Sequence, residues 1–158
     1  MADLEALLDE AKELLPDLIE LRRAIHAEPE LGLELPKTRE KLLERLEALP
    51  LEIETHAKTS GVVATLRGAG GGRSLELNAH MDTIPLDHRP AEIKDGYVYG
   101  RGATDMKGGL AAATEAIRAI QEAGVRLKGD LLVSTHGLHE LPGGHGEDLT
   151  ARVARGIH

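Results

Sequence analysis

His80, Asp82 and Asp105 are of the residue types that hold a hydrated divalent cation. The first two stand in SLELNAHMDTIP at the end of an expected strand, and Asp105 follows in YGRGATDMKGGLAAATEAI just before an expected helix. An imidazole and a carboxylate bind metals such as Zn²⁺, and a second carboxylate commonly orients the imidazole. The two segments therefore predict a metal site at the ends of buried elements.

His80 alone would more often be an ordinary histidine at a strand end. If the extended backbone continues past His80, however, residues two apart share a face, and Asp82 can accept a hydrogen bond from the imidazole. Because metal-bound histidines usually need such an acceptor to fix their tautomer, the pair favours a ligand role for His80.

Asp105 has a second interpretation. Aspartate is a favoured N-cap, and the position before a helix by itself favours that role. The glycines around it, at positions 100, 102, 108 and 109, indicate instead unusual backbone torsions and close approach. From the residues alone both roles stay open.

Histidines and a glutamate gather again in HGLHELPGGH, residues 136–145. His139-Glu140 resembles the start of a His-Glu-x-x-His zinc helix, but the next histidine, His145, lies beyond a proline and two glycines, through which no helix runs. A loop after a strand is the better interpretation, and His145 is more readily a loop residue than a ligand.

Hydrophobic spacing predicts the elements that must position these side chains, because a period of 3.6 favours helices and alternation favours strands. The expected helices cover residues 3–27 with a break near Pro16, 36–49, 107–123 and 147–155; the expected strands cover 51–56, 61–68, 74–79 and 130–136, with DGYVYG a short strand or hairpin arm. The segment GAGGG, 68–72, precedes a strand and not a helix, so it is interpreted as a turn and not as a phosphate loop. Alternating strands and helices predict an α/β fold with a mixed, mostly parallel sheet flanked by helices.

The composition excludes several classes of protein. A chain of 158 residues with 41% hydrophobic residues suits one domain, whose core must be aliphatic because Phe and Trp are absent. The net charge of −8 argues against nucleic-acid binding, and the lack of Cys excludes disulfides and thiolate metal sites. No apolar run approaches the roughly 18 residues of a membrane span, and the acidic N-terminus is unlike a secretory signal. A soluble, cytoplasmic protein without a membrane partner is expected.

Together these segments resemble a co-catalytic zinc metallopeptidase and amidohydrolase family that includes acetylornithine deacetylase, succinyl-diaminopimelate desuccinylase, aminoacylase and the glutamate-releasing carboxypeptidase. LNAHMDTIP and GRGATDMKGGLAAA are the most specific parts, and LRRAIHAEPELGLELPKT resembles the N-terminal helix of the amidohydrolase branch. The resemblance implies a zinc-exopeptidase-like catalytic domain, incomplete at the C-terminus, over residues 1–158. The family's C-terminal half and inserted dimerisation domain are then absent.

The resemblance also implies roles for the site residues. His80 binds one metal, Asp105 bridges two, Glu140 binds a metal, and Asp82 is the carboxylate that supports His80. At the position of His139 the family has a glutamate that acts as general base. His139 would replace it, since an imidazole can accept a proton near pH 7.

By this resemblance the whole protein hydrolyses amide bonds in N-acyl amino acids or small peptides, with two Zn²⁺ ions, or Co²⁺ in their place, in a complete site. The peptide bond between Asp105 and Met106 is expected to be cis, and a trans bond would count against the bridging role. The chain itself is expected to be truncated and inactive, and to self-associate through an uncovered sheet edge or apolar face. The alternative is a non-catalytic metal-binding or interaction module derived from such a hydrolase, which the exchange at His139 also favours.

Overall fold

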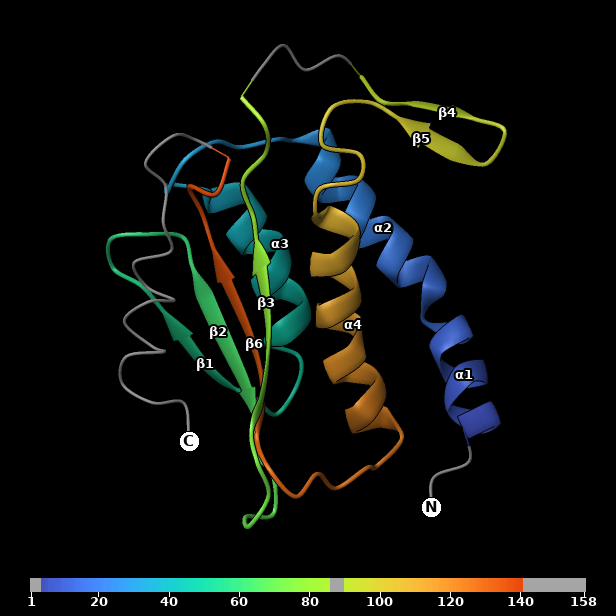
Figure 1. Ribbon diagram of the computed structural model, residues 1–158, viewed down its shortest axis with the longest axis vertical. Coiled ribbons are helices and arrows are strands. Elements are labelled where there is room, and N and C mark those ends of the chain that lie inside the picture. The colour runs from blue at the N-terminus through green and yellow to red at the C-terminus, as the bar shows by residue number, and fades with distance from the viewer. Residues whose placement is uncertain (1–3, 86–89, 141–158) are drawn as a thin grey trace.

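A four-stranded sheet with helices packed against it forms the body of the protein, as the computed structural model of residues 4–85 and 90–140 shows (Figure 1). The elements follow one another as α1 (Leu4–Glu13), α2 (Leu15–Ala27), α3 (Pro36–Leu46), β1 (Glu52–Thr55), β2 (Val62–Leu66), β3 (Leu75–His80), β4 (Glu92–Lys94), β5 (Tyr97–Tyr99), α4 (Lys107–Glu122) and β6 (Leu131–His136). These bounds confirm the expected elements up to residue 140. The helix expected over 147–155 lies outside the described residues.

Proline and glycine set several of the boundaries. Pro16 lies in the first turn of α2, where its missing N–H costs nothing, so the predicted break separates α1 from α2 there. α3 likewise begins at Pro36. Gly70 and Gly71, between β2 and β3, have φ of 89° and 83°, which confirms that GAGGG is a turn.

The sheet has the order β1-β2-β6-β3 and is mixed, as expected. The expectation that it is mostly parallel is wrong, because β1–β2 and β2–β6 are antiparallel and only β3–β6 is parallel in the described sheet. The connections explain the difference. A parallel pair needs a crossover, which α4 supplies between β3 and β6, whereas the short link between β1 and β2 makes a hairpin.

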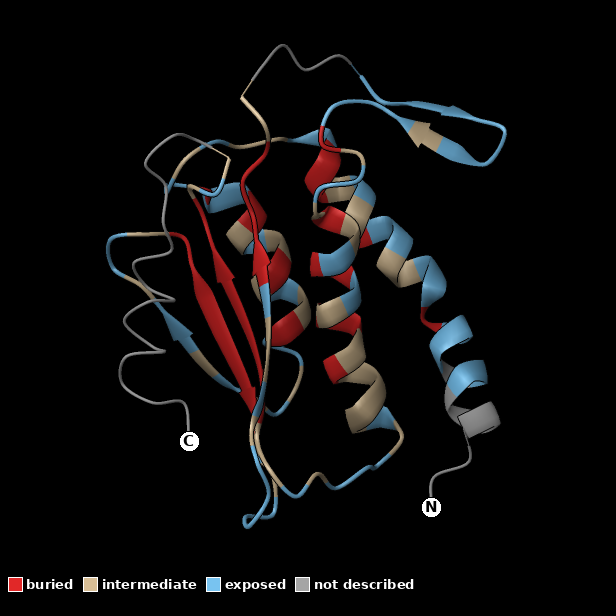
Figure 2. Ribbon diagram, in the orientation of Figure 1, coloured by how far each residue is buried: buried red, intermediate tan, exposed pale blue. Residues whose placement is uncertain are grey.

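Burial is deepest in the two central strands, as Figure 2 shows. Every residue of β2 and of β6 is buried, so these strands are covered on both faces. On one face, aliphatic side chains of the sheet and of three helices form one cluster. It includes Leu21 and Ile25 of α2, Leu42 and Leu46 of α3, Leu110 and Ala111 of α4, and Val62, Ala64 and Ala79 of the strands. The core is therefore aliphatic, as the composition predicts.

The remaining element is a hairpin that projects from the body beside α2 (Figure 1). β4 and β5 pair antiparallel with each other in a separate two-stranded sheet. They confirm DGYVYG as a hairpin arm. Among the described residues, no helix combines the length and apolar character that crossing a bilayer requires.

Leu42→Ala tests the α3 interface with the sheet. Leu42 is completely buried in the main cluster, so its truncation is expected to lower the free energy of unfolding by about 2–5 kcal/mol. Leu8→Ala, at a position on α1 that is 57% exposed, is the matched control and should change it by less than about 1 kcal/mol. Urea denaturation followed by circular dichroism measures both; equal losses would mean that α3 does not contribute to the core.

Candidate metal centre

The parallel pair of strands brings two histidines to the same edge of the sheet. His80 ends β3 and His136 ends β6, and the two are direct partners in the register. The backbone stays ordered beyond this point, since the Met81 N–H donates to the His136 carbonyl oxygen at 2.8 Å. The carboxyl ends of parallel strands are the usual location of sites in α/β folds.

His80 is held from both sides of its ring. The imidazole is 2% exposed, and its Nδ1 lies 3.2 Å from Asp82 Oδ1 and 3.1 Å from the Asp82 carbonyl oxygen. Its Nε2 lies 3.0 Å from Asp105 Oδ1. Burial disfavours the charged ring, but the hydrogen bonds to the two carboxylates outweigh it and raise the pKa of His80. The i, i+2 pairing predicted for His80 and Asp82 is therefore present.

Asp82 connects this imidazole to the loop that follows β6. Its side chain is buried, and its Oδ2 accepts a hydrogen bond from the Glu140 N–H at 2.9 Å. Burial opposes the charged carboxyl, yet the hydrogen bonds from His80 and from the backbone of Glu140 and His139 lower the pKa of Asp82. One carboxylate thus positions both His80 and the segment that carries Glu140.

The loop 137–140 is fixed by close contact with the turn after α2. A Cβ on Gly137 would lie 2.3 Å from the Gly32 carbonyl oxygen, so only glycine fits there. The Leu138 N–H donates to that same oxygen at 2.8 Å, with Leu138 at a φ of 59°. Glu140 Oε1 then lies buried 3.5 Å from His80 Nε2, without a hydrogen-bond partner in the described chain.

Asp105 is not the N-cap of α4, because Met106 holds that position and no side chain caps the helix. Its carboxylate turns toward His80, and the hydrogen bond from His80 lowers the pKa of Asp105 despite some burial cost. α2 positions the preceding loop: Arg22 donates to the Ala103 carbonyl oxygen, and His26 Nε2 lies 2.6 Å from the Arg101 carbonyl oxygen.

His80, Asp105 and Glu140 converge as the sequence predicts, with one ligand atom of each within 4.8 Å of the others. Two ligands at about 2.0–2.2 Å from one Zn²⁺ are at most about 4.4 Å apart, so small side-chain movements would place all three around one ion. The unpartnered Glu140 Oε1 and the set of one imidazole and two carboxylates fit zinc. Their role as ligands stays a prediction.

The expected cis bond between Asp105 and Met106 is wrong, since no peptide bond among the described residues is cis. A cis bond between two non-proline residues costs about 3–4 kcal/mol and persists only where surrounding contacts compensate. The described contacts of Asp105, a hydrogen bond to His80 above all, form with the trans bond. This weakens the expectation that Asp105 bridges two metals.

Three further residues lie around the proposed ligands: His139, and also His136 and Lys107, to which the sequence assigned no role. The His139 ring stacks on His80 with centroids 4.5 Å apart, and His136 meets His139 edge-on at 5.9 Å. Lys107 is 1% exposed, and its Nζ has no hydrogen-bond partner in the described part of the chain. Burial lowers the pKa of Lys107, although the nearby Asp82 and Glu140 oppose the shift.

His136 ends its strand as His80 does. This shared position in the sequence could have indicated that His136 lies near the site. Lys107 gave no such signal, because a lysine at the start of a helix is usually exposed. His145 lies outside the described residues.

Comparisons with known proteins show which proteins the chain is similar to. Residues 77–147 match the model of peptidase family M20/M25/M40. An N-formyl-4-amino-5-aminomethyl-2-methylpyrimidine deformylase of Halalkalibacterium halodurans is 35% identical over 89 residues, which cover 50% of this chain and 21% of the relative. A succinyl-diaminopimelate desuccinylase of Wolinella succinogenes is 41% identical over 87 residues, which cover 50% of this chain and 22% of the relative.

The fold is also that of a solved member of the family. A dinuclear metal binding peptidase from the M20 family of Bacillus subtilis superposes with a TM-score of 0.71 at 24% identity, over 92% of this chain and 42% of that one. The chain thus spans less than half of the length of the proteins it matches. The matched segment contains His80, Asp82, Asp105, His139 and Glu140. By this segment and by these relatives, the chain is similar to peptidase family M20/M25/M40, and it shares the fold of a solved member of that family.

Proposed function

We propose that this chain supplies the zinc-binding part of a hydrolase that cleaves amide bonds in N-acyl amino acids or small peptides. The observation that carries the proposal is the convergence of His80, Asp105 and Glu140 at the carboxyl edge of the sheet, behind which Asp82 is buried. The printed names of the relatives, a deformylase and a desuccinylase, support removal of an acyl group as the reaction class.

His80, Asp105 and Glu140 would hold the zinc ion, and the same donors suit Co²⁺. When bound, such an ion supplies Lewis acidity and lowers the pKa of water. The described donors form one cluster, which suits one ion. A second ion, with Asp105 as the bridge, requires donors beyond this cluster and remains part of the proposal for a complete site.

Asp82 and His139 would act on either side of His80. Asp82 holds the Nδ1 of His80, which directs Nε2 toward the other two ligands. His139 stacks on the His80 ring and is exposed, so its imidazole is placed to accept the proton that water loses during hydrolysis. It would do so in place of the carboxylate that the family has there.

A non-catalytic metal-binding module is the second candidate. The histidine at position 139 favours it, since it departs from the pattern expected for a two-metal hydrolase. Both candidates bind zinc through the same residues, so only an assay of turnover separates them.

Asp82→Asn is expected to weaken zinc binding by about 10–100-fold, because the variant loses the charged acceptor that orients His80. Asp95→Asn, in the exposed turn of the β4–β5 hairpin, is the control and should bind zinc as the unmodified chain does. Competition with a chromophoric chelator measures both dissociation constants. Equal constants would mean that Asp82 does not support a metal ligand.

Zinc affinity is expected to rise with pH. The increase should end at a higher pH than it would for a histidine with an ordinary pKa. The pKa of His80 is raised above 6.5, so below that raised value zinc must displace a proton and binding weakens by about tenfold per pH unit. Above it, this dependence disappears. In Asp82→Asn the rise should end at a lower pH, because one of the hydrogen bonds that raise the pKa is weakened. Titrations between pH 5.5 and 8.5 give the profile, and coincident profiles would contradict this assignment.

The zinc-loaded 158-residue chain is expected to hydrolyse N-acetyl amino acids and dipeptides no faster than free zinc. The described residues that could act as ligands suit one metal ion. The carbonyl oxygen of a substrate, which develops negative charge during hydrolysis, would therefore not be stabilised by a second ion. His139→Ala is the control variant. Robust turnover that His139→Ala abolishes would show that the chain is a complete catalyst with His139 as its base. Absence of turnover, together with turnover in a longer form that adds a carboxylate and a histidine ligand, is the expected result.

A further inference from the structure

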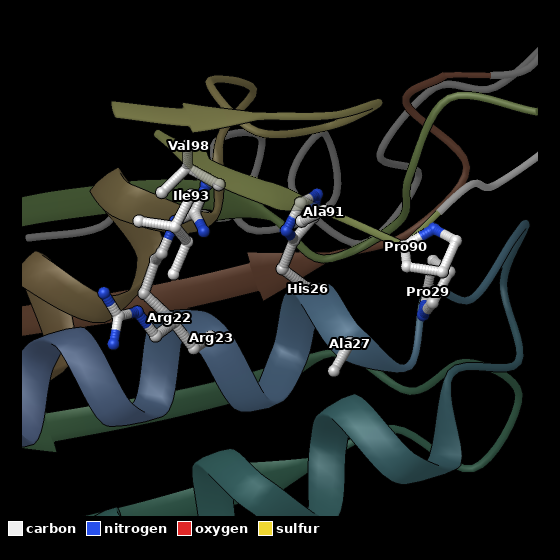
Figure 3. A pocket seen from close by; sticks show the side chains of 9 residues that line it. All are labelled: Arg22, Arg23, His26, Ala27, Pro29, Pro90, Ala91, Ile93 and Val98. Carbon is white, nitrogen blue, oxygen red and sulfur yellow. The ribbon is translucent and has the colours of Figure 1, made fainter. Parts of the chain in front are cut away.

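A pocket that the metal-site analysis does not use lies between α2 and the β4–β5 hairpin. Its volume is about 430 Å³, within the range of small-molecule sites. Figure 3 shows that its walls come from segments far apart in the sequence. Arg22, Arg23 and His26 stand on α2, and Ile93 and Val98 face them from the hairpin.

One side of the pocket is apolar. Pro29, Pro90 and Ala91 line its end, and Ile93 and Val98 form the wall opposite α2. Ile93 is 56% exposed although it faces this pocket, so an aliphatic ligand would remove much of its surface from water. The outward face of the hairpin carries Tyr97 and Tyr99 instead, because they pair with Lys94 and Glu92 in the register.

The other side is cationic. Of the described residues that line the pocket, two carry a guanidinium group, one carries an imidazole and none carries a carboxylate, in a chain whose net charge is −8. Within the described residues, neither Arg22 nor Arg23 forms an ion pair. By contrast, Arg45 lies 3.0 Å from a carboxylate oxygen of Glu20.

The positive charges of Arg22 and Arg23 repel each other. Burial, and then the charge of Arg23, lower the pKa of Arg22. Arg22 uses one nitrogen to hold the Ala103 carbonyl oxygen, and its guanidinium has further donors for an anion. A carboxylate between the two groups would offset their repulsion and accept several charge-assisted hydrogen bonds.

We propose that this pocket binds a small carboxylate with an aliphatic chain, the carboxylate on Arg22 and Arg23 and the chain against Ile93 and Val98. Such a ligand would contact residues that also hold the loop of Asp105. Arg22 and His26 form hydrogen bonds with the backbone of that loop, at Ala103 and Arg101. The site is separate from the proposed zinc ligands and requires no metal.

Hexanoate is the probe, and methyl NMR spectra of the isoleucine- and valine-labelled chain give the readout. The Ile93 and Val98 methyl signals should shift saturably with hexanoate, in zinc-free protein as in zinc-loaded protein. Hexanol, which has the same chain without the charge, should bind at least about tenfold more weakly. Shifts that require zinc would place the carboxylate on the metal and overturn the proposal, whatever the outcome of the hydrolysis assay.

Exposed arginines allow a matched comparison of variants. Arg23→Gln should weaken hexanoate binding by about tenfold or more, while Arg23→Lys, which keeps the charge, should retain most of the affinity. Arg126→Gln, at an exposed position after α4, should leave binding unchanged. Equal affinities of Arg23→Gln and Arg126→Gln, or equal binding of hexanoate and hexanol, would show that the arginines do not form a carboxylate site.

Discussion

The candidate metal centre depends on one buried carboxylate, that of Asp82. An isolated charge at a position that is 1% exposed would be strongly unfavourable, so its oxygens must be satisfied by donors. One oxygen faces the His80 ring and the other accepts the N–H of Glu140. The same pair of contacts that makes burial of Asp82 tolerable therefore places two of the three predicted ligands.

Helices and strands position the residues that make these contacts. β2 and β6 are buried throughout, and β6 delivers the loop of Glu140 beside β3, which delivers His80. The third ligand, Asp105, comes from a loop that α2 holds through Arg22 and His26. Side chains on such a support lose little freedom on binding, so the proposed site needs only small side-chain movements to hold a cation.

Departures from the expected family pattern lie in the part of the site that would perform the chemistry. His80, Asp82 and Glu140, which would position an ion, are present and in contact. The group that would take a proton differs, with an imidazole at position 139. The contacts of the described residues therefore bear on the proposed binding of a cation more directly than on the proposed hydrolysis.

Features that depend on near neighbours along the chain could be predicted from the amino-acid sequence. The periodicity of apolar residues predicted the helices and strands, and the i, i+2 spacing predicted that Asp82 supports His80, because an extended backbone imposes that geometry locally. Features that depend on contacts between segments far apart in the sequence became visible only in the folded protein. The tertiary structure removed the N-cap interpretation of Asp105, made β6 antiparallel to β2, and brought Arg22 to face Ile93. No local pattern encodes these outcomes, since they follow from how segments tens of residues apart pack to bury their apolar faces.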